Sequence, residues 1–440
     1  MLPDHAADPL TRDLLAFIEA APTPYHAVFE LAARLDRAGF RRLFERDSFK
    51  LAPGESGYLV RGGGSIAAFR VGKKSPAEAG FAIVGAHTDS PNLRLKPKPE
   101  LTAHGYEQLA VEVYGGVLLH TWLDRDLGLA GRIVLEDGST RLVRLPGIFG
   151  SVPSLAIHLN RDVNSAGLTL NAQTQLSPVA ALEVEGGGLE LLERVAAAAG
   201  GGVSPKAIQG TDLCLFDTLP PALGGARGEL IYSARLDNLA SCHAALTALL
   251  GASADADATR VIVLYDHEEV GSESASGAGS RFLEAVLTRL LEGQDAGRDG
   301  LTRAVAGSLL VSADMAHALH PSYADKHDKL HRPLLGKGPV LKVNVAQRYA
   351  TDGPTAARFR AACAKVDVEP QHFVSRNDIG CGSTIGPIAA AGLGLRTVDV
   401  GSPMLSMHSC REMAASADVP VMVRVLTAFF DHFSPLDPAV

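Results

Sequence analysis

Apolar residues recur along this chain with two spacings, and each spacing predicts a different kind of element. In residues 10–20 and 26–38 they recur every three or four positions, which predicts two amphipathic helices. Pro22 and Pro24 separate these helices, because proline within a helix removes a hydrogen bond and clashes with the preceding turn. The same spacing predicts two later helices, over residues 238–250 and 281–291.

Short runs of consecutive apolar residues predict strands that are buried on both faces of a sheet. These runs cover residues 81–86, 230–236, 259–264, 308–313 and 395–401. Because the runs alternate with helical segments, the chain predicts an α/β fold, with helices on both faces of a sheet in a three-layer α/β/α domain.

Residues 95–228 have a different pattern. Apolar and polar positions alternate in residues 133–145 on either side of an Asp-Gly turn, which predicts an antiparallel hairpin. We therefore expect an inserted β-rich domain over residues 95–228. The catalytic domain would then be discontinuous, comprising residues 1–94 and 229–440.

Acidic and histidine side chains stand where the predicted strands end or in the loops that follow. They are His87, Asp237, Glu268, Glu269, Asp314 and His408. In open α/β sheets the functional site lies at the carboxyl ends of the strands. Each position alone has a plain alternative, such as a solvated glutamate, a structural histidine or a helix-capping aspartate. Their shared chemistry at equivalent positions favours one common site.

Spacing within two pairs, Glu268 with Glu269 and His87 with Asp89, suggests a separate chemical role for each member. Successive side chains on an extended backbone point to opposite sides, so one of Glu268 and Glu269 could bind a metal while the other carries a proton. Asp89 follows His87 by two residues and shares its face. Its carboxylate can hold one ring nitrogen of His87 and leave the other for a metal.

The mixture of carboxylates and imidazoles suits Zn²⁺, Mn²⁺ or Co²⁺, and the absence of cysteines from the set argues against a soft-metal site. The set is large enough for two metals that share a bridging carboxylate, with one glutamate to spare. This combination is typical of two-metal hydrolysis.

Composition and charge exclude other classes of function. The net charge of −8 over 440 residues disfavours binding to nucleic acid or to an anionic membrane. The chain has no apolar run of about 18 residues, so we expect no membrane span. Its N-terminus lacks the basic and apolar regions of a secretion signal. Five scattered cysteines without a Cys-x-x-Cys pair favour reduced thiols and a cytoplasmic location.

Several short motifs stand in order along the chain: Gly85–Pro91, Ala234–Asn238, Asp266–Ser272, Ser312–His317, Lys342–Asn344, Gln347–Tyr349, Arg376–Ile385 and Met407–Glu412. Through them the chain resembles the M18 metallopeptidases, the aspartyl aminopeptidases, over nearly its full length. Glycine- and alanine-rich patches around residues 186–202 and 251–258 depart from the family pattern, but no metal-ligand position does.

The resemblance implies a di-metal aminopeptidase domain with two zinc ions per subunit, Mn²⁺ or Co²⁺ being alternatives. Asp237 would bridge the two metals. The remaining ligands would be His87 and Asp314 at one metal, and Glu269 and His408 at the other.

The resemblance also implies residues for catalysis and for substrate binding. Glu268 would be the general base, and Asp89 would be the second catalytic residue, beside His87. The substrate would be contacted by His158, His317, Lys342 and Tyr349. His158 would act in the site of a neighbouring subunit, within a dodecamer built from dimers that the inserted domain holds together.

The predicted reaction is removal of N-terminal residues, of the acidic type (Asp or Glu), from peptides by a metal-activated water. A two-metal phosphoesterase would use similar ligands, but the sequence lacks a basic cluster for phosphate. A related aminopeptidase or deacylase that prefers neutral residues stays open. An inactive oligomeric scaffold also stays open, although it predicts lost ligands.

Acidic substrates need a cation in a site that is crowded with carboxylates. Lys342 interrupts an apolar run over residues 339–345 and is the candidate for this cation. The alternative is a lysine on an edge strand that points into solvent.

Overall fold

The computed structural model describes residues 8–48, 50–292, 297 and 299–435. Its largest sheet has nine strands within these ranges. In order across the sheet they are β1 (Arg41–Leu43), β2 (Ser56–Arg61), β3 (Ser65–Arg70), β13 (Thr259–Tyr265), β4 (Phe81–His87), β14 (Leu309–Ala313), β18 (Arg396–Gly401), β16 (Val340–Val343) and β17 (Gln371–Val374). The four central strands β13, β4, β14 and β18 run parallel, so their carboxyl ends meet at one edge.

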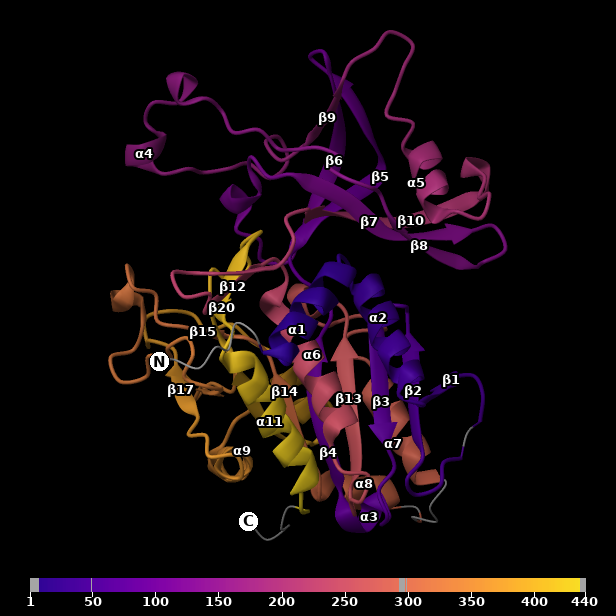
Figure 1. Cartoon of the computed structure of the whole chain (residues 1–440), viewed down its shortest axis with the longest axis vertical. Coiled ribbons are helices and arrows are strands. Elements are labelled where there is room, and N and C mark those ends of the chain that lie inside the picture. The colour runs from indigo at the N-terminus through magenta and orange to yellow at the C-terminus, as the bar shows by residue number, and fades with distance from the viewer. Residues whose placement is uncertain (1–7, 49, 293–296, 298, 436–440) are drawn as a thin grey trace.

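Helices cover both faces of this sheet, as the sequence predicted (Figure 1). One face carries α1 (Pro9–Ala20), α2 (Pro24–Arg37), α6 (Leu236–Gly251), α9 (Gly353–Ala364) and α11 (Asp418–Asp431). The other face carries α3 (Pro76–Ala79), α7 (Phe282–Glu292), α8 (Gly300–Ala306) and α10 (Ile385–Leu393). Within β4, Val84 packs in the first core and Ile83 in the second, because successive strand residues face opposite sides. The three-layer α/β fold is confirmed.

A second sheet has six strands among the described residues and lies beyond one end of the first (Figure 1). In order they are β8 (Thr140–Arg144), β7 (Leu127–Leu135), β10 (Ile208–Asp217), β5 (Asn92–Ala103), β6 (Tyr106–Tyr114) and β9 (Val179–Leu182), with α5 (Leu191–Ala199) packed beside them. The predicted hairpin is β7–β8. This sheet has its own apolar core, which includes Leu109, Ile133 and Leu215. Strand β5 begins at Asn92, three residues before the domain boundary expected at residue 95.

A third, smaller sheet joins segments that are far apart in the chain. It consists of β11 (Ala222–Gly224), β12 (Leu230–Ser233), β20 (Glu412–Ala415), β19 (Pro403–Leu405) and β15 (Ala316–His317). The apolar run at 230–236 therefore forms a strand outside the nine-stranded sheet, because β12 pairs with β20. The predicted helix at 238–250 is α6, although Asp237 and Asn238 near its start have non-helical backbone angles.

No helix in the described part of the chain is long and apolar enough to cross a membrane.

Candidate active site

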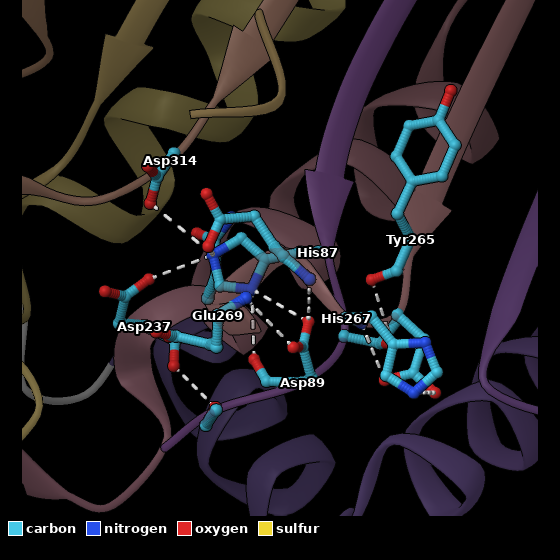
Figure 2. Close-up of polar contacts among 12 residues, drawn as sticks. His87, Asp89, Asp237, Tyr265, His267, Glu269 and Asp314 are labelled. Carbon is cyan, nitrogen blue, oxygen red and sulfur yellow. Dashed lines mark hydrogen bonds and ion pairs between the residues drawn. The ribbon is translucent and has the colours of Figure 1, made fainter. Parts of the chain in front are cut away.

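The predicted metal ligands come together where the carboxyl ends of the central strands meet (Figure 2). His87 ends β4, and Asp314 directly follows β14. Asp237 comes from the start of α6, and His408 from the loop between β19 and β20. Glu269 lies just after β13. The ends of three strands, one loop and one helix start are thus needed to assemble the cluster.

Asp237 lies at the centre of the cluster and turns each carboxylate oxygen toward a different histidine. Its Oδ1 is 3.3 Å from His87 Nε2, and its Oδ2 is 3.4 Å from His408 Nε2. On the outer sides, His87 Nε2 is 3.6 Å from Asp314 Oδ1, and His408 Nε2 is 3.4 Å from Glu269 Oε2. The geometry divides the five side chains into two groups that share Asp237.

These separations fit metal coordination. Two ligand atoms of a tetrahedral zinc site with bonds of about 2.0–2.1 Å lie about 3.3–3.4 Å apart. The ligand atoms of His87, Asp237 and Glu269 all lie within 4.8 Å of one another. Asp237 Oδ1 and Glu269 Oε1 are buried and have no hydrogen-bond partner among the described residues. Buried carboxylate oxygens of this kind are costly unless a cation satisfies them.

In both predicted ligand histidines, a hydrogen bond on Nδ1 leaves Nε2 available to a metal. His87 Nδ1 is 3.0 Å from the carbonyl oxygen of Asp89, and His408 Nδ1 is 3.0 Å from that of Gly116. A carbonyl oxygen only accepts, so Nδ1 must carry the proton in each ring. The lone pair then sits on Nε2, which in both cases faces the carboxylates.

The backbone of Glu268 and Glu269 is not extended, as the sequence predicted, but turned. His267 adopts a left-handed conformation with φ of 66°, and Glu268–Val270 form a short 3-10 helix, η5. Glu269 nevertheless reaches His408, whereas Glu268 Oε2 lies 4.0 Å from His87 Nε2. Burial raises the pKa of Glu268 to about 7. The two side chains point to different partners because of the turn.

Asp89 contacts both His87 and the backbone of the paired glutamates. Its Oδ2 accepts a 2.6 Å hydrogen bond from the Tyr114 hydroxyl, and its two oxygens accept 3.2 Å bonds from the backbone N–H groups of Glu268 and Glu269. Asp89 Oδ1 also lies 3.4 Å from His87 Nδ1. Burial opposes its charge, but the contacts with His87 and Tyr114 lower the pKa of Asp89 overall. Asp89 therefore orients η5 as well as His87.

Comparison with known proteins identifies the family. The profile described as "Aminopeptidase I zinc metalloprotease (M18)" matches residues 17–430. The chain belongs to the M18 family. A relative in Pseudomonas aeruginosa (strain UCBPP-PA14), "Probable M18 family aminopeptidase 2", is 48% identical over 426 residues, which cover 96% of this chain and 98% of the relative. The protein of the same name in Streptomyces coelicolor is 48% identical over 425 residues, covering 95% and 97%.

Solved M18 structures have the same fold. The chain is similar to one in "Cryo-EM structure of the Ape4 and Nbr1 complex", with a TM-score of 0.93 and 40% identity over 98% of this chain and 87% of that one. It is also similar to the S. cerevisiae mApe1 dodecamer, with a TM-score of 0.85 and 30% identity over 97% of each chain. This M18 protein is therefore a metal-dependent aminopeptidase of a zinc metalloprotease family.

A pocket of about 410 Å³ has Met407, the residue before His408 in the chain, in its lining. His317 and Tyr349, both expected at the substrate, lie in its wall together with Phe373, Arg376 and Cys381. The His317 ring lies 5.5 Å from that of Phe373 and packs edge-on against it.

Lys342 lies on β16, which is flanked by β18 and β17, so it is not on an edge strand. Its side chain is 2% exposed, and the solvent-facing alternative is therefore wrong. The Nζ atom donates a 2.9 Å hydrogen bond to the Met315 carbonyl and lies 3.3 Å from Asp314 Oδ2. It also lies 5.2 Å from the centre of the Tyr349 ring.

His158 does not join the cluster within one chain. It lies on the short 3-10 helix η3 (Ile157–Leu159), in an exposed loop beside the second sheet. Leu155, Ile157 and Leu159 around it are also exposed, at 63%, 46% and 75%. An apolar loop of this kind is suited to contact with another surface.

Sequence reasoning assigned no role to Glu412, which supports two ligands at once. One carboxylate oxygen accepts a 3.1 Å bond from the Asp237 N–H, and the other accepts a 2.9 Å bond from the His408 N–H. Glu412 is buried. Its place at the end of a family motif was a signal, but a partner 175 residues away could not be read from spacing.

Proposed function

We propose that this M18 protein is a two-metal aminopeptidase that removes acidic residues from the N-termini of peptides. The observation that carries the proposal is Asp237, whose two oxygens face two histidines that each have Nε2 free. We assign His87 and Asp314 to one zinc, Glu269 and His408 to the other, and Asp237 to both. The domain assignment, with a catalytic domain over residues 1–94 and 229–440 and an inserted domain over 95–228, is part of the proposal.

Zinc bound in this cluster would lower the pKa of a water and polarise the carbonyl of the first peptide bond. Glu268 is placed to act on that water, because its carboxylate lies beside His87 without being one of the four outer ligands. Glu268 takes the proton as the water attacks the carbonyl carbon, and then passes it to the leaving amine. Burial raises the pKa of the Glu268 carboxyl group, which favours its uptake of that proton.

The preference for acidic residues rests on Lys342. A lysine ammonium has three donors, and two of them are directed to Met315 and Asp314. One donor is left for the carboxylate of an Asp or Glu substrate; Lys342 itself is not among the residues that line the pocket, but its Nζ lies 5.2 Å from the ring centre of Tyr349, which does line it. A second candidate is a preference for neutral residues, and it is favoured if the charge of Lys342 is already neutralised by Asp314.

We propose that the active form is a homo-oligomer. The exposed loop that carries His158 would enter the substrate site of a neighbouring subunit, as the resemblance implies. The related mApe1 structure is described as a dodecamer, which supports a dodecamer built from dimers here. A cytoplasmic location stays a prediction that cell fractionation would test.

Metal analysis combined with a substrate panel tests this function. The purified protein should contain about two zinc ions per chain and should cleave N-terminal Asp and Glu anilides faster than Ala or Leu anilides. Asp237→Asn should weaken both metals together, and the loss of only one would remove its bridging role. Protein without bound metal, and without rescue by added Zn²⁺, Mn²⁺ or Co²⁺, would refute the proposal.

A further inference from the structure

One segment of the second sheet reaches into the metal cluster. Residues Tyr114–Thr121 run from the end of β6 into the short 3-10 helix η2 (Leu119–Trp122). They lie next to Glu269 and next to the loop that carries His408. His408 is 292 residues after Gly116 in the sequence. We call Tyr114–Thr121 the bracing segment.

The bracing segment holds the His408 loop at three points. The Gly116 carbonyl accepts from His408 Nδ1 at 3.0 Å, and the Leu118 N–H donates to the His408 carbonyl at 3.1 Å. The Thr121 hydroxyl accepts from the Cys410 N–H at 2.9 Å. The first contact orients the ring, and the other two hold the backbone that follows it, from the His408 carbonyl to the Cys410 N–H.

Two consecutive glycines let the bracing segment come this close. A Cβ atom on Gly116 would lie 3.2 Å from His408 Nδ1, and one on Gly115 would lie 3.1 Å from Glu269 Cβ. Gly115 also has φ of 77°, which other residues rarely adopt. A methyl group at either position would push one of the two ligands by a few tenths of an ångström.

We propose that the bracing segment is the outer shell of the zinc site formed by Glu269 and His408, and that its seating sets the zinc affinity of that site. This rests on the proposed metal roles of Glu269 and His408. The hydrogen bonds of Gly116, Leu118 and Thr121 described above all go to the His408 loop and none goes to His87 or Asp314, so this part of the brace acts on one zinc; Tyr114, by contrast, donates to Asp89 beside His87. The second sheet thus contributes to metal binding in its own subunit, apart from any role in assembly.

The residues of the bracing segment are positioning residues, and zinc affinity is their readout. Gly116→Ala should weaken one zinc by about 10–100-fold, the usual effect of losing an outer-shell partner, and leave the other unchanged. Affinities are measured by competition of each purified protein with a chromophoric chelator. Gly188→Ala is the matched control, because a Cβ there meets nothing within 4 Å and the residue lies in the same domain.

Thr121→Val is a second, milder variant that removes the acceptor for Cys410 and keeps the shape of the side chain. It should weaken the same zinc by on the order of 2–10-fold, the effect of one lost hydrogen bond. The inference would be overturned if folded Gly116→Ala bound both zinc ions with wild-type affinity. It would also be overturned if both affinities fell by the same factor. Wild-type protein that binds no zinc would instead refute the proposed function.

Discussion

At the scale of single residues, the site depends on which atom of each side chain is already occupied. His87 and His408 donate Nδ1–H to carbonyl oxygens, so each has one nitrogen free to bind a metal. Lys342 is directed toward Asp314 by the same logic, since the Met315 carbonyl holds its ammonium group at the end of a buried stem. These contacts fix the orientation of all three side chains.

Glu268 and Glu269 should respond differently to the same substitution. Glu268→Gln should retain zinc and lower kcat by about 10²–10⁴-fold, because only proton transfer is lost. Glu269→Gln should lose zinc, because a neutral amide is a weaker ligand beside His408. Zinc analysis and steady-state kinetics on both variants would check this. An exchange of the two phenotypes would reverse our assignment of the pair.

Lys342→Met should reveal whether the buried ammonium group binds the acidic side chain of the substrate. A charge-assisted contact is worth about 1.5–3 kcal/mol, so kcat/KM on N-terminal Asp and Glu should fall by roughly 10–150-fold. Activity on Ala and Leu substrates should persist. Equal losses on all four substrates, measured at matched zinc content, would mean that Lys342 serves only to hold Asp314.

At the scale of elements, buried carboxylates tie together segments that are far apart in the sequence. Glu412 on β20 ties the start of α6 to the His408 loop. Asp418 at the start of α11 accepts 2.8 Å bonds from the N–H groups of Gly336 and Gly338, in the turn before β16. β16 carries Lys342, so α11 helps to place the strand that holds this buried lysine.

The junction between α11 and β16 should make stability depend on pH. Burial raises the pKa of Asp418 to about 7, so the folded state keeps a proton that the unfolded chain releases above pH 4. The contribution of Asp418 to the free energy of unfolding is therefore largest at low pH. It falls by up to about 1.4 kcal/mol per pH unit as the pH rises to 7. The stability difference between wild type and Asp418→Asn in urea should therefore shrink from pH 5 to pH 7. Parallel pH profiles of the two proteins would contradict this.

At the scale of the whole molecule, the two large sheets have separate cores but meet at the active site. The nine-stranded sheet supplies the ends of β4, β13 and β14, and the second sheet supplies the bracing segment. The same domain as the second sheet carries the exposed apolar loop around His158. Under the proposals made above, assembly and metal binding would thus both depend on this one sheet.

Shared sites between subunits can be tested by complementation. His158→Phe should lower turnover and leave zinc content unchanged, because His158 is remote from the cluster of its own chain. Oligomers mixed from His158→Phe and Glu268→Gln subunits should recover activity that neither variant has alone, since some sites then combine an intact Glu268 with an intact His158. No recovery, or a fully active dilute monomer, would exclude a site completed by a neighbour.

The sequence by itself determined the layered α/β fold and the chemical type of the ligands. Burial on both faces of a strand leaves a run of apolar residues, and the ends of parallel strands must converge, so both can be read from local pattern. It could not determine that Lys342 is buried, that η5 is a turn, or that Glu412 and Gly116 hold His408. Those features depend on contacts between segments up to 292 residues apart, and on backbone groups that every residue carries. Only the tertiary structure decides which of these identical groups meet.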